Sequence, residues 1–225
     1  MASLLTKSSG CGQPTLSSEG KSKHFSLLML LCTWLVVIGL GLTGLWAYSA
    51  TAAQVETAST RLPEVGGIWT GIHVRTLVMF IHPQCACSRA SLAELEELMV
   101  QATDKFEARV ILVLPTGAPG DWSHSRNASL AASIAGVTVS TDVSGLLAKT
   151  FHATTSGETF VYDADGQLEF HGGITGVRGH VGQNPGRTAI EQLMLTGHPG
   201  KASTPVFGCG LFNNRCDRTN ETCPR

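Results

Sequence analysis

Two cysteines separated by one residue, Cys85 and Cys87, lie between an apolar strand-like run at 76–81 and a helix-like pattern that begins at Ser88. A thiol at the start of a helix meets unpaired backbone N–H groups and the positive end of the helix dipole. Both stabilise the thiolate and lower the thiol pKa from its free value of about 8.5. Because the thiolate is the nucleophile of disulfide exchange, the turn predicts a redox pair, with Cys85 as the exposed attacking thiol and Cys87 as its resolving partner.

The spacing of this pair departs from the Cys-x-x-Cys motif, in which Ser88 would be the second cysteine. A disulfide requires Cα atoms about 4.4–6.8 Å apart, which residues two positions apart reach only in a bent backbone. Such strain makes a disulfide easier to reduce and therefore a stronger oxidant. Arg89 is next in the chain, and its charge is expected to stabilise the thiolate further. Two buried, reduced cysteines without redox chemistry are the structural alternative.

The same stretch, HPQCAC, also offers ligands for a soft metal ion. His82, Cys85 and Cys87 combine an imidazole with two thiolates, a set that suits copper(I) or zinc. His180 follows later in the chain, in a loop that a hairpin would bring near. Disulfide exchange itself requires no cofactor, so copper or zinc belongs to an alternative hypothesis, a metal-handling protein that uses the two cysteines and a histidine.

Residues 25–48 form an uncharged segment that is long enough to cross a bilayer as a helix. Lys7, Lys21 and Lys23 precede it, and the positive-inside rule places that side in the cytoplasm. A cleaved signal peptide is the alternative, but its apolar core is usually only about 7–15 residues long. We therefore expect an uncleaved, single-pass anchor with residues 50–225 outside the cytoplasm.

Five of the cysteines follow the anchor, in a compartment where disulfides form readily. They are Cys85, Cys87, Cys209, Cys216 and Cys223. Because five is odd, at least one thiol must be free or paired between molecules. A local structural disulfide is expected in the tail, either Cys209–Cys216 or Cys216–Cys223. The alternative is that one tail cysteine resolves Cys85.

Strand-like and helix-like patterns alternate along the rest of the chain. Strands are expected at 76–81, 109–114 and 137–140, helices from 88 and at 122–135 and 145–151, a hairpin at 159–171 and a closing helix at 188–195. Strands that alternate with helices predict a parallel sheet covered on both faces. The closing antiparallel hairpin and helix narrow the expected α/β fold to a thioredoxin-like mixed sheet flanked by helices and preceded by one transmembrane helix.

The chain of 225 residues therefore divides into one domain and several accessory segments. The expected parts are a disordered cytoplasmic tail (1–24), a transmembrane helix (25–48), a linker (49–66), a thioredoxin-like domain (67–196) and a cysteine-containing tail (197–225). The formal net charge is only −1. That balance gives no reason to expect a nucleic-acid partner.

Three stretches, FIHPQCACSRASLAELEELM, FHATTSGETFVYDADGQLEFHGGITGVRGHVGQNPGR and TPVFGCG, resemble the thioredoxin-like RedB-like proteins, a group of membrane-anchored bacterial proteins. The resemblance covers about residues 70–210. It implies a thioredoxin-like fold on the periplasmic side of the bacterial inner membrane. The cysteine pair, rather than the resemblance, predicts protein thiols or disulfides outside the cytoplasm as partners.

One departure from the thioredoxin pattern lies before the hairpin. Thioredoxin-like proteins carry a cis-proline there, which faces the active cysteines, pairs with substrate and keeps metals away from the thiols. Here Thr155, Ser156 and Gly157 occupy the stretch, which changes substrate handling and favours the metal alternative. A glycine-rich loop follows the hairpin at 172–186, and its Arg178 and His180 are expected to reach the cysteine face.

These patterns lead to one main hypothesis, a membrane-anchored, extracytoplasmic thiol–disulfide oxidoreductase that uses Cys85 and Cys87. Ser88, Arg89 and residues 155–157 are expected to support the pair. The metal-handling protein is the first alternative. The second is a thioredoxin-like interaction module without turnover.

Overall fold

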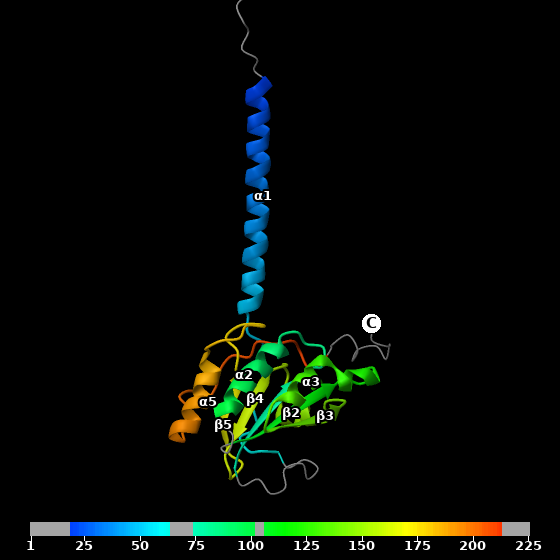
Figure 1. The fold of residues 1–225 in the computed structure, drawn as a ribbon, viewed down its shortest axis with the longest axis vertical. Coiled ribbons are helices and arrows are strands. Elements are labelled where there is room, and N and C mark those ends of the chain that lie inside the picture. The colour runs from blue at the N-terminus through cyan, green and yellow to red at the C-terminus, as the bar shows by residue number, and fades with distance from the viewer. Residues whose placement is uncertain (1–18, 64–73, 102–105, 213–225) are drawn as a thin grey trace, which may run out of the picture. The chain divides into compact units, whose positions relative to one another are not determined.

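The computed structural model describes residues 19–63, 74–101 and 106–212 (Figure 1). It divides into two units, Met1–Trp46 and Ala47–Arg225, and the second contains the sheet. In the first unit, α1 (Glu19–Ala50) carries a candidate membrane span, His24–Ala50, with a mean hydropathy of 2.4 and no buried residue. A helix is therefore present where residues 25–48 predict one, and it is long and apolar enough to cross a bilayer.

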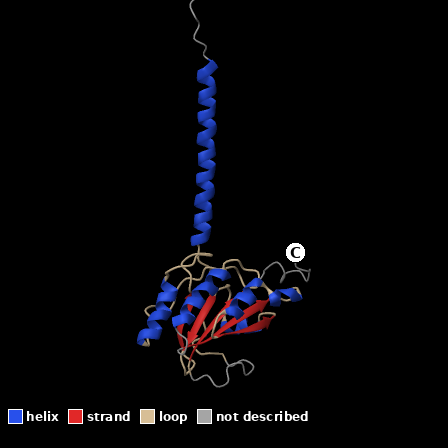
Figure 2. Ribbon diagram, viewed as in Figure 1, coloured by secondary structure: helices blue, strands red, loops and turns tan. Residues whose placement is uncertain are grey.

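The second unit is built on one mixed sheet of five strands (Figure 2). Its spatial order is β3-β2-β1-β4-β5. The first three strands run parallel, and β4 and β5 are antiparallel additions beside β1. The bounds are β1 Arg75–Ile81, β2 Phe106–Leu114, β3 Val137–Val143, β4 Glu158–Tyr162 and β5 Leu168–Gly173. The predicted thioredoxin-like mixed sheet is confirmed.

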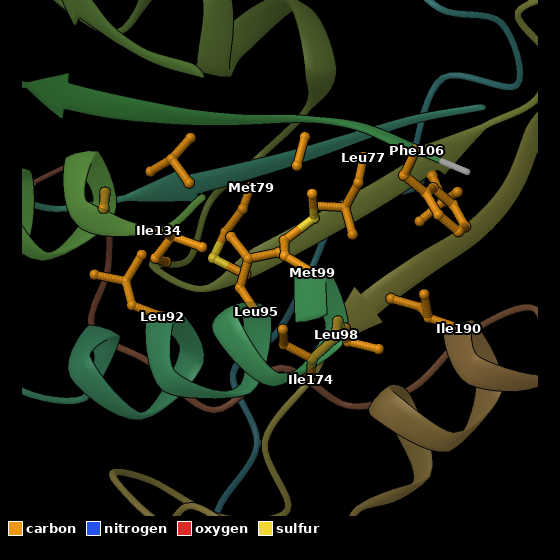
Figure 3. Packing of buried hydrophobic residues seen from close by; sticks show 14 of the residues in the cluster. Leu77, Met79, Leu92, Leu95, Leu98, Met99, Phe106, Ile134, Ile174 and Ile190 are labelled. Carbon is orange, nitrogen blue, oxygen red and sulfur yellow. The ribbon is translucent and has the colours of Figure 1, made fainter. Parts of the chain in front are cut away.

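Helices cover both faces of this sheet. Alternate residues of β1 point to opposite faces, so Met79 packs with one hydrophobic cluster and Phe80 with the other. The first cluster also contains residues of α2, α3 and α5, and Figure 3 shows Leu92, Leu95 and Leu98 of α2 directed into it. The second contains residues of α4. The helices are α2 Ser88–Gln101, α3 Arg126–Ser133, α4 Leu146–Phe151 and α5 Pro185–Thr196.

The expected helix at 122–135 is in fact two short elements. The first is a 3-10 helix, η1 (Gly120–His124), and the second is α3, which begins two residues later at Arg126. Ser125 separates them in an extended conformation, and its side chain accepts a hydrogen bond from the backbone N–H of Ala128. Serine is among the preferred N-cap residues because its oxygen satisfies one of the unpaired N–H groups of the first turn. The apolar spacing alone did not reveal this internal cap.

Parts of the expected linker and tail are hydrogen-bonded to the domain. The backbone N–H of Ala53 donates to the carbonyl of Val206 at 2.8 Å, and that of Leu62 donates to Gly166 at 2.8 Å. Residues 203–211, which we call the C-terminal strap, pair first with β5 through a His171–Ser203 bridge and then with the loop that precedes β4. Val206 and Leu211 of the strap are buried. The strap is therefore a component of the domain.

Candidate functional site

The cysteine pair lies in the turn that joins β1 to α2, as predicted. The backbone N–H of Cys85 donates to the carbonyl of His82 at 3.1 Å, and that of Ser88 donates to the carbonyl of Cys85 at 3.3 Å. Asn127 of α3, which is buried, holds the turn from the side. Its amide donates to the carbonyl of His82 at 3.2 Å and to that of Cys85 at 2.9 Å. The turn is thus fixed both by its own backbone and by a neighbouring helix.

Cys85 is only 2% exposed, so the prediction of an exposed attacking thiol is wrong. The pKa of this thiol is nevertheless lowered, as its place before α2 predicts. The main cause is a hydrogen bond from the thiol of Cys209, and the side chain and backbone of Ser88 and the backbone of Cys209 also donate to the sulfur. Burial opposes these donors but does not overcome them. The donors around the buried Cys85 sulfur therefore favour its thiolate form.

Two buried serines connect this sulfur to the end of β1. The backbone N–H of His82 donates to Oγ of Ser156 at 2.7 Å, and Oγ of Ser156 lies 2.6 Å from Oγ of Ser88. Ser156 accepts from His82, and either hydroxyl can be the donor in the contact between Ser156 and Ser88. Ser88 and Ser156, both expected in supporting roles, therefore stabilise negative charge on Cys85.

Cys87 differs from its neighbour in both exposure and protonation. It is half-buried, and its pKa is raised, first by burial and then by the negative charge of Cys85. The positive charge of Arg178 acts in the opposite direction. Arg89, which was expected to supply this charge, is exposed and is not among the main causes of the pKa shift of either thiol. The cation beside the thiols thus comes from the glycine-rich loop.

The C-terminal strap brings a third thiol to the site. It pairs antiparallel with the loop before β4 through a Thr155–Gly210 bridge. The N–H of Ser156 donates to the carbonyl of Cys209 at 2.8 Å, and the N–H of Leu211 donates to the carbonyl of Thr154 at 2.9 Å. This pairing fixes the backbone of Cys209 opposite the start of α2.

The sulfur atoms of Cys85, Cys87 and Cys209 all lie within 4.8 Å of one another. All three are free thiols. The pKa of Cys209 is raised, chiefly because its proton is held in the hydrogen bond to Cys85. Cys216, the expected disulfide partner of Cys209, lies outside the described residues, so that pairing stays a prediction. The structure thus brings a tail cysteine beside the two thiols of the turn, as the alternative role for a tail cysteine requires.

The two histidines proposed as metal ligands do not belong to this group. Nδ1 of His82 accepts a hydrogen bond from the backbone N–H of Gln84 at 3.1 Å, and the ring packs edge-on against Trp122. Burial lowers the pKa of His82, which favours the neutral ring. His180 lies in the glycine-rich loop and is exposed. Within the described residues, the ligand set available for a metal is therefore three sulfurs.

A buried carboxylate supports the loop that pairs with the strap. Oε2 of Glu158 accepts from the backbone N–H groups of Thr154 at 2.9 Å and Thr155 at 3.0 Å. Its Oε1 lies 2.7 Å from Nε2 of His171 on β5. Glu158 has no exposed surface. Sequence reasoning missed this residue because a single glutamate at a strand start gives no sign of burial.

Gly157 completes the loop for a steric reason. Its φ of +90° is unfavourable for other residues, and a Cβ there would lie 2.6 Å from Oγ of Ser91. Its N–H donates to the carbonyl of Phe80 at 2.7 Å. The residues expected at 155–157 therefore support the site mainly through their backbone, with Ser156 adding its hydroxyl.

Comparison with known proteins places the fold but gives no activity. No family model matches the chain, and no curated protein matches it. A hypothetical protein from Sinorhizobium meliloti 1021 has a similar structure, with a TM-score of 0.58, 21% identity, and coverage of 73% of this chain and 99% of that one. An uncharacterised conserved protein from Geobacillus kaustophilus gives a TM-score of 0.54, 16% identity, and coverage of 73% and 93%.

The narrower resemblance to RedB-like proteins stays a prediction, since no match tests it. The fold itself is clear from the strand order β3-β2-β1-β4-β5 and from the cysteine turn between β1 and α2. The chain is a protein of thioredoxin-like fold with three thiols gathered at the start of its first domain helix.

Proposed function

We propose that this domain is a thiol–disulfide oxidoreductase in which Cys85 is the nucleophile. The observation that carries the proposal is the set of hydrogen-bond donors around one sulfur atom. Ser88 and Cys209 direct side-chain and backbone protons at Cys85, and a second thiol is already in contact with it. A thiolate held in this way is prepared to attack a disulfide, because the charged form reacts.

The proposed partners are protein thiols or disulfides outside the cytoplasm. α1 would anchor the domain in the bacterial inner membrane, with the N-terminus in the cytoplasm and the domain in the periplasm. Length and hydropathy of His24–Ala50 support the span, and the lysines before it support the orientation. A reporter enzyme that is active only outside the cytoplasm, fused after Arg225, should give a signal. A signal from a cytoplasm-specific reporter at the same place would contradict the compartment.

The redox activity can be tested on the purified full chain in detergent. Reduced protein should reduce a model disulfide, and Cys85→Ser should lower the rate at least about 1,000-fold, because no other thiol has the same donors. Arg89→Ala is the matched control, since this residue is two positions from Cys87 but exposed and without effect on the thiol pKa values. A chain that exchanges no disulfide at all would instead support the non-catalytic interaction module.

A second candidate function is supported by the distance between the three sulfurs. Thiolates about 2.3 Å from a common metal lie roughly 4 Å apart in trigonal or tetrahedral geometry, which is compatible with three sulfurs within 4.8 Å. Copper(I) and zinc both accept such soft ligands. The domain would then carry a metal ion on Cys85, Cys87 and Cys209 instead of on two cysteines and a histidine.

Titration of the reduced full chain with copper(I) against a chelator distinguishes this candidate. A metal carrier should retain one ion per chain, lose it in Cys209→Ser and keep it in His82→Ala and His180→Ala. Loss of the ion in either histidine variant would contradict the three-sulfur site. Release of all copper by dialysis, together with rapid disulfide exchange, would leave only the oxidoreductase.

A further inference from the structure

We propose that Cys209, rather than Cys87, resolves the mixed disulfide on Cys85, so that the oxidised protein carries a Cys85–Cys209 disulfide. This inference rests on the proposed oxidoreductase function and identifies its second thiol. The redox centre would then join the first domain helix to the C-terminal strap, although its two cysteines are far apart in the sequence.

The placement of Cys209 is the first argument. Its carbonyl accepts from the N–H of Ser156, and its neighbours Gly210 and Leu211 continue the pairing along Thr155 and Thr154. Because the strap backbone is held on both sides of Cys209, the thiol does not have to travel to meet Cys85. The sulfurs of Cys209 and Cys85 already lie within 4.8 Å of each other.

The close approach of the strap is the second argument. A Cβ on Gly208 would lie 1.8 Å from the carbonyl oxygen of Ser156, so only glycine permits the contact. Nη1 of Arg178 donates to the carbonyl of Gly208 from the other side. The residue before Cys209 is thus clamped between the β4 loop and the glycine-rich loop. This geometry keeps the third thiol beside the nucleophile without a covalent bond.

Cys87 is less well placed for the same reaction. The N–H of Ser88 donates to the carbonyl of Cys85, and the N–H of Ala90 donates to the carbonyl of Cys87 at 3.0 Å. Both cysteines therefore lie in hydrogen-bonded turns just before α2, and their sulfurs are within the same 4.8 Å as that of Cys209. A disulfide across one intervening residue reaches the required Cα and Cβ separations only in a bent backbone. A bond between Cys85 and Cys87 would thus strain this turn, whereas Cys209 approaches from a separate segment.

The proposed steps balance as follows. The Cys85 thiolate attacks a partner disulfide R–S–S–R′, a Cys85–S–S–R bond forms, and R′–S⁻ leaves. The departing thiolate takes the proton of Cys209. The Cys209 thiolate then attacks the Cys85 sulfur, the Cys85–Cys209 disulfide forms, and R–S⁻ leaves. Two electrons pass from the two protein thiols to the partner disulfide, which becomes two thiols.

Peptide mapping tests this pairing directly. The reduced full chain is oxidised with excess oxidised glutathione, quenched with acid, alkylated and digested with trypsin. Cleavage after Arg75 and Arg89 gives peptide 76–89, which contains both Cys85 and Cys87, and cleavage after Lys201 and Arg215 gives peptide 202–215, which contains Cys209. We expect the two peptides to be joined by a disulfide, with Cys87 alkylated.

Two matched variants separate the resolving thiols. Cys209→Ser should accumulate glutathione on Cys85, with at least about tenfold more trapped mixed disulfide than the wild type. Cys87→Ser should still form the linked peptides, at a rate within about threefold of the wild type. Cys209→Ala is added because its melting temperature and that of Cys209→Ser check whether either change disturbs folding. If both variants unfold, the linkage found in the Cys87→Ser protein decides the question.

Three results would contradict the proposed role of Cys209 or the proposed function. A disulfide within peptide 76–89, with trapping in Cys87→Ser and not in Cys209→Ser, would overturn the assignment and leave the oxidoreductase intact. A link from peptide 202–215 to the tail peptide 216–218, which contains Cys216, would overturn it in favour of a structural disulfide. A wild type in which neither peptide reacts with glutathione would overturn the proposed function itself.

Discussion

The two sides of the thiol site are held in different ways. On one side, the β1–α2 turn is fixed by local hydrogen bonds and by Asn127, and it presents Cys85 and Cys87. On the other, the strap presents Cys209 only because its backbone pairs with a loop that is distant in the sequence. The local hydrogen bonds of the β1–α2 turn are enough to place Cys85 and Cys87. The second side requires the whole domain to be folded, so its loss should be separable from loss of the nucleophile.

The largest effect should come from Glu158, which supports the loop under the strap. Glu158→Ala leaves two backbone N–H groups and His171 without their buried acceptor, and each buried donor left unsatisfied costs about 1–3 kcal/mol. Chemical denaturation should show this loss. Glu158→Gln keeps an acceptor and should lose less. Equal stability of Glu158→Ala and the wild type would contradict the supporting role of this carboxylate.

Gly208→Val should detach the strap while leaving the turn in place. The added side chain would collide with the Ser156 carbonyl, and overpacking of this kind costs about 1–3 kcal/mol. Cys85, no longer covered by Cys209, should be alkylated faster under native conditions. Gly210→Ala is the matched control, since its Cβ would meet Phe212 at an ordinary 3.6 Å. Unchanged protection of Cys85 in Gly208→Val would show that the strap does not cover the thiol.

The pH dependence of alkylation should separate the two cysteines of the turn. The lowered pKa of Cys85 predicts that its reaction, although slowed by burial, persists at about pH 6, where a thiol of pKa near 8.5 is almost fully protonated. Its rate falls only as the pH drops through the lowered pKa. Cys87, whose pKa is raised, should react only at alkaline pH.

The polar and ionisable groups that interact with the Cys85 thiol are Ser88, Cys87, Cys209 and His82. Cys209→Ser removes the largest cause of the lowered pKa and should move the alkylation profile of Cys85 to higher pH. Mass spectrometry of the labelled peptide assigns each rate to its cysteine. If the alkylation rates of Cys85 and Cys87 depended on pH in the same way, the predicted difference between their pKa values would be wrong.

A smaller effect is expected from Ser88→Ala. The change removes one hydrogen bond to the Cys85 thiolate and leaves the donors from Cys209. A hydrogen bond to a charged group contributes about 1.5–3 kcal/mol, and the remaining backbone donors reduce the loss. The alkylation profile should therefore shift upward by roughly one pH unit. A larger shift than in Cys209→Ser would reverse the ranking of the two donors.

The smallest contrast is between two arginines. Arg178→Gln should slow the alkylation of Cys87 and the formation of the Cys85–Cys209 disulfide by about threefold to tenfold. The reason is that the charge of Arg178 favours the thiolates of Cys87 and Cys209. Arg89→Gln should have no measurable effect on either rate. A larger loss of rate in Arg89→Gln than in Arg178→Gln would instead support the sequence-based prediction that Arg89 stabilises the thiolate.

Much of the sheet could be predicted because its signals are local. Apolar runs at 76–81 and 109–114 and the Asp165–Gly166 turn mark strands and a hairpin that the structure contains. The turn with Cys85 and Cys87 could be predicted from local sequence patterns in the same way. The bounds were less accurate, since β2 begins at Phe106 and β3 extends to Val143.

The third thiol could not be predicted with the same reasoning. Around Cys209 the strap pairs with a loop rather than a strand, so that part of it has no alternation of apolar and polar residues. Its one local sign is the pair of glycines around Cys209, which permits close backbone approach but is common in loops. Burial of Cys85 follows from the strap and was missed for the same reason.

The strap also has a consequence for competition between partners. The backbone edge at Thr154–Ser156 is already paired by the protein's own chain, and a tethered segment acts at an effective concentration on the order of millimolar. A partner that binds by adding a strand to that edge would have to displace it. For the proposed oxidoreductase, such extended partners would be disfavoured relative to those that expose a disulfide without needing main-chain pairing at this edge.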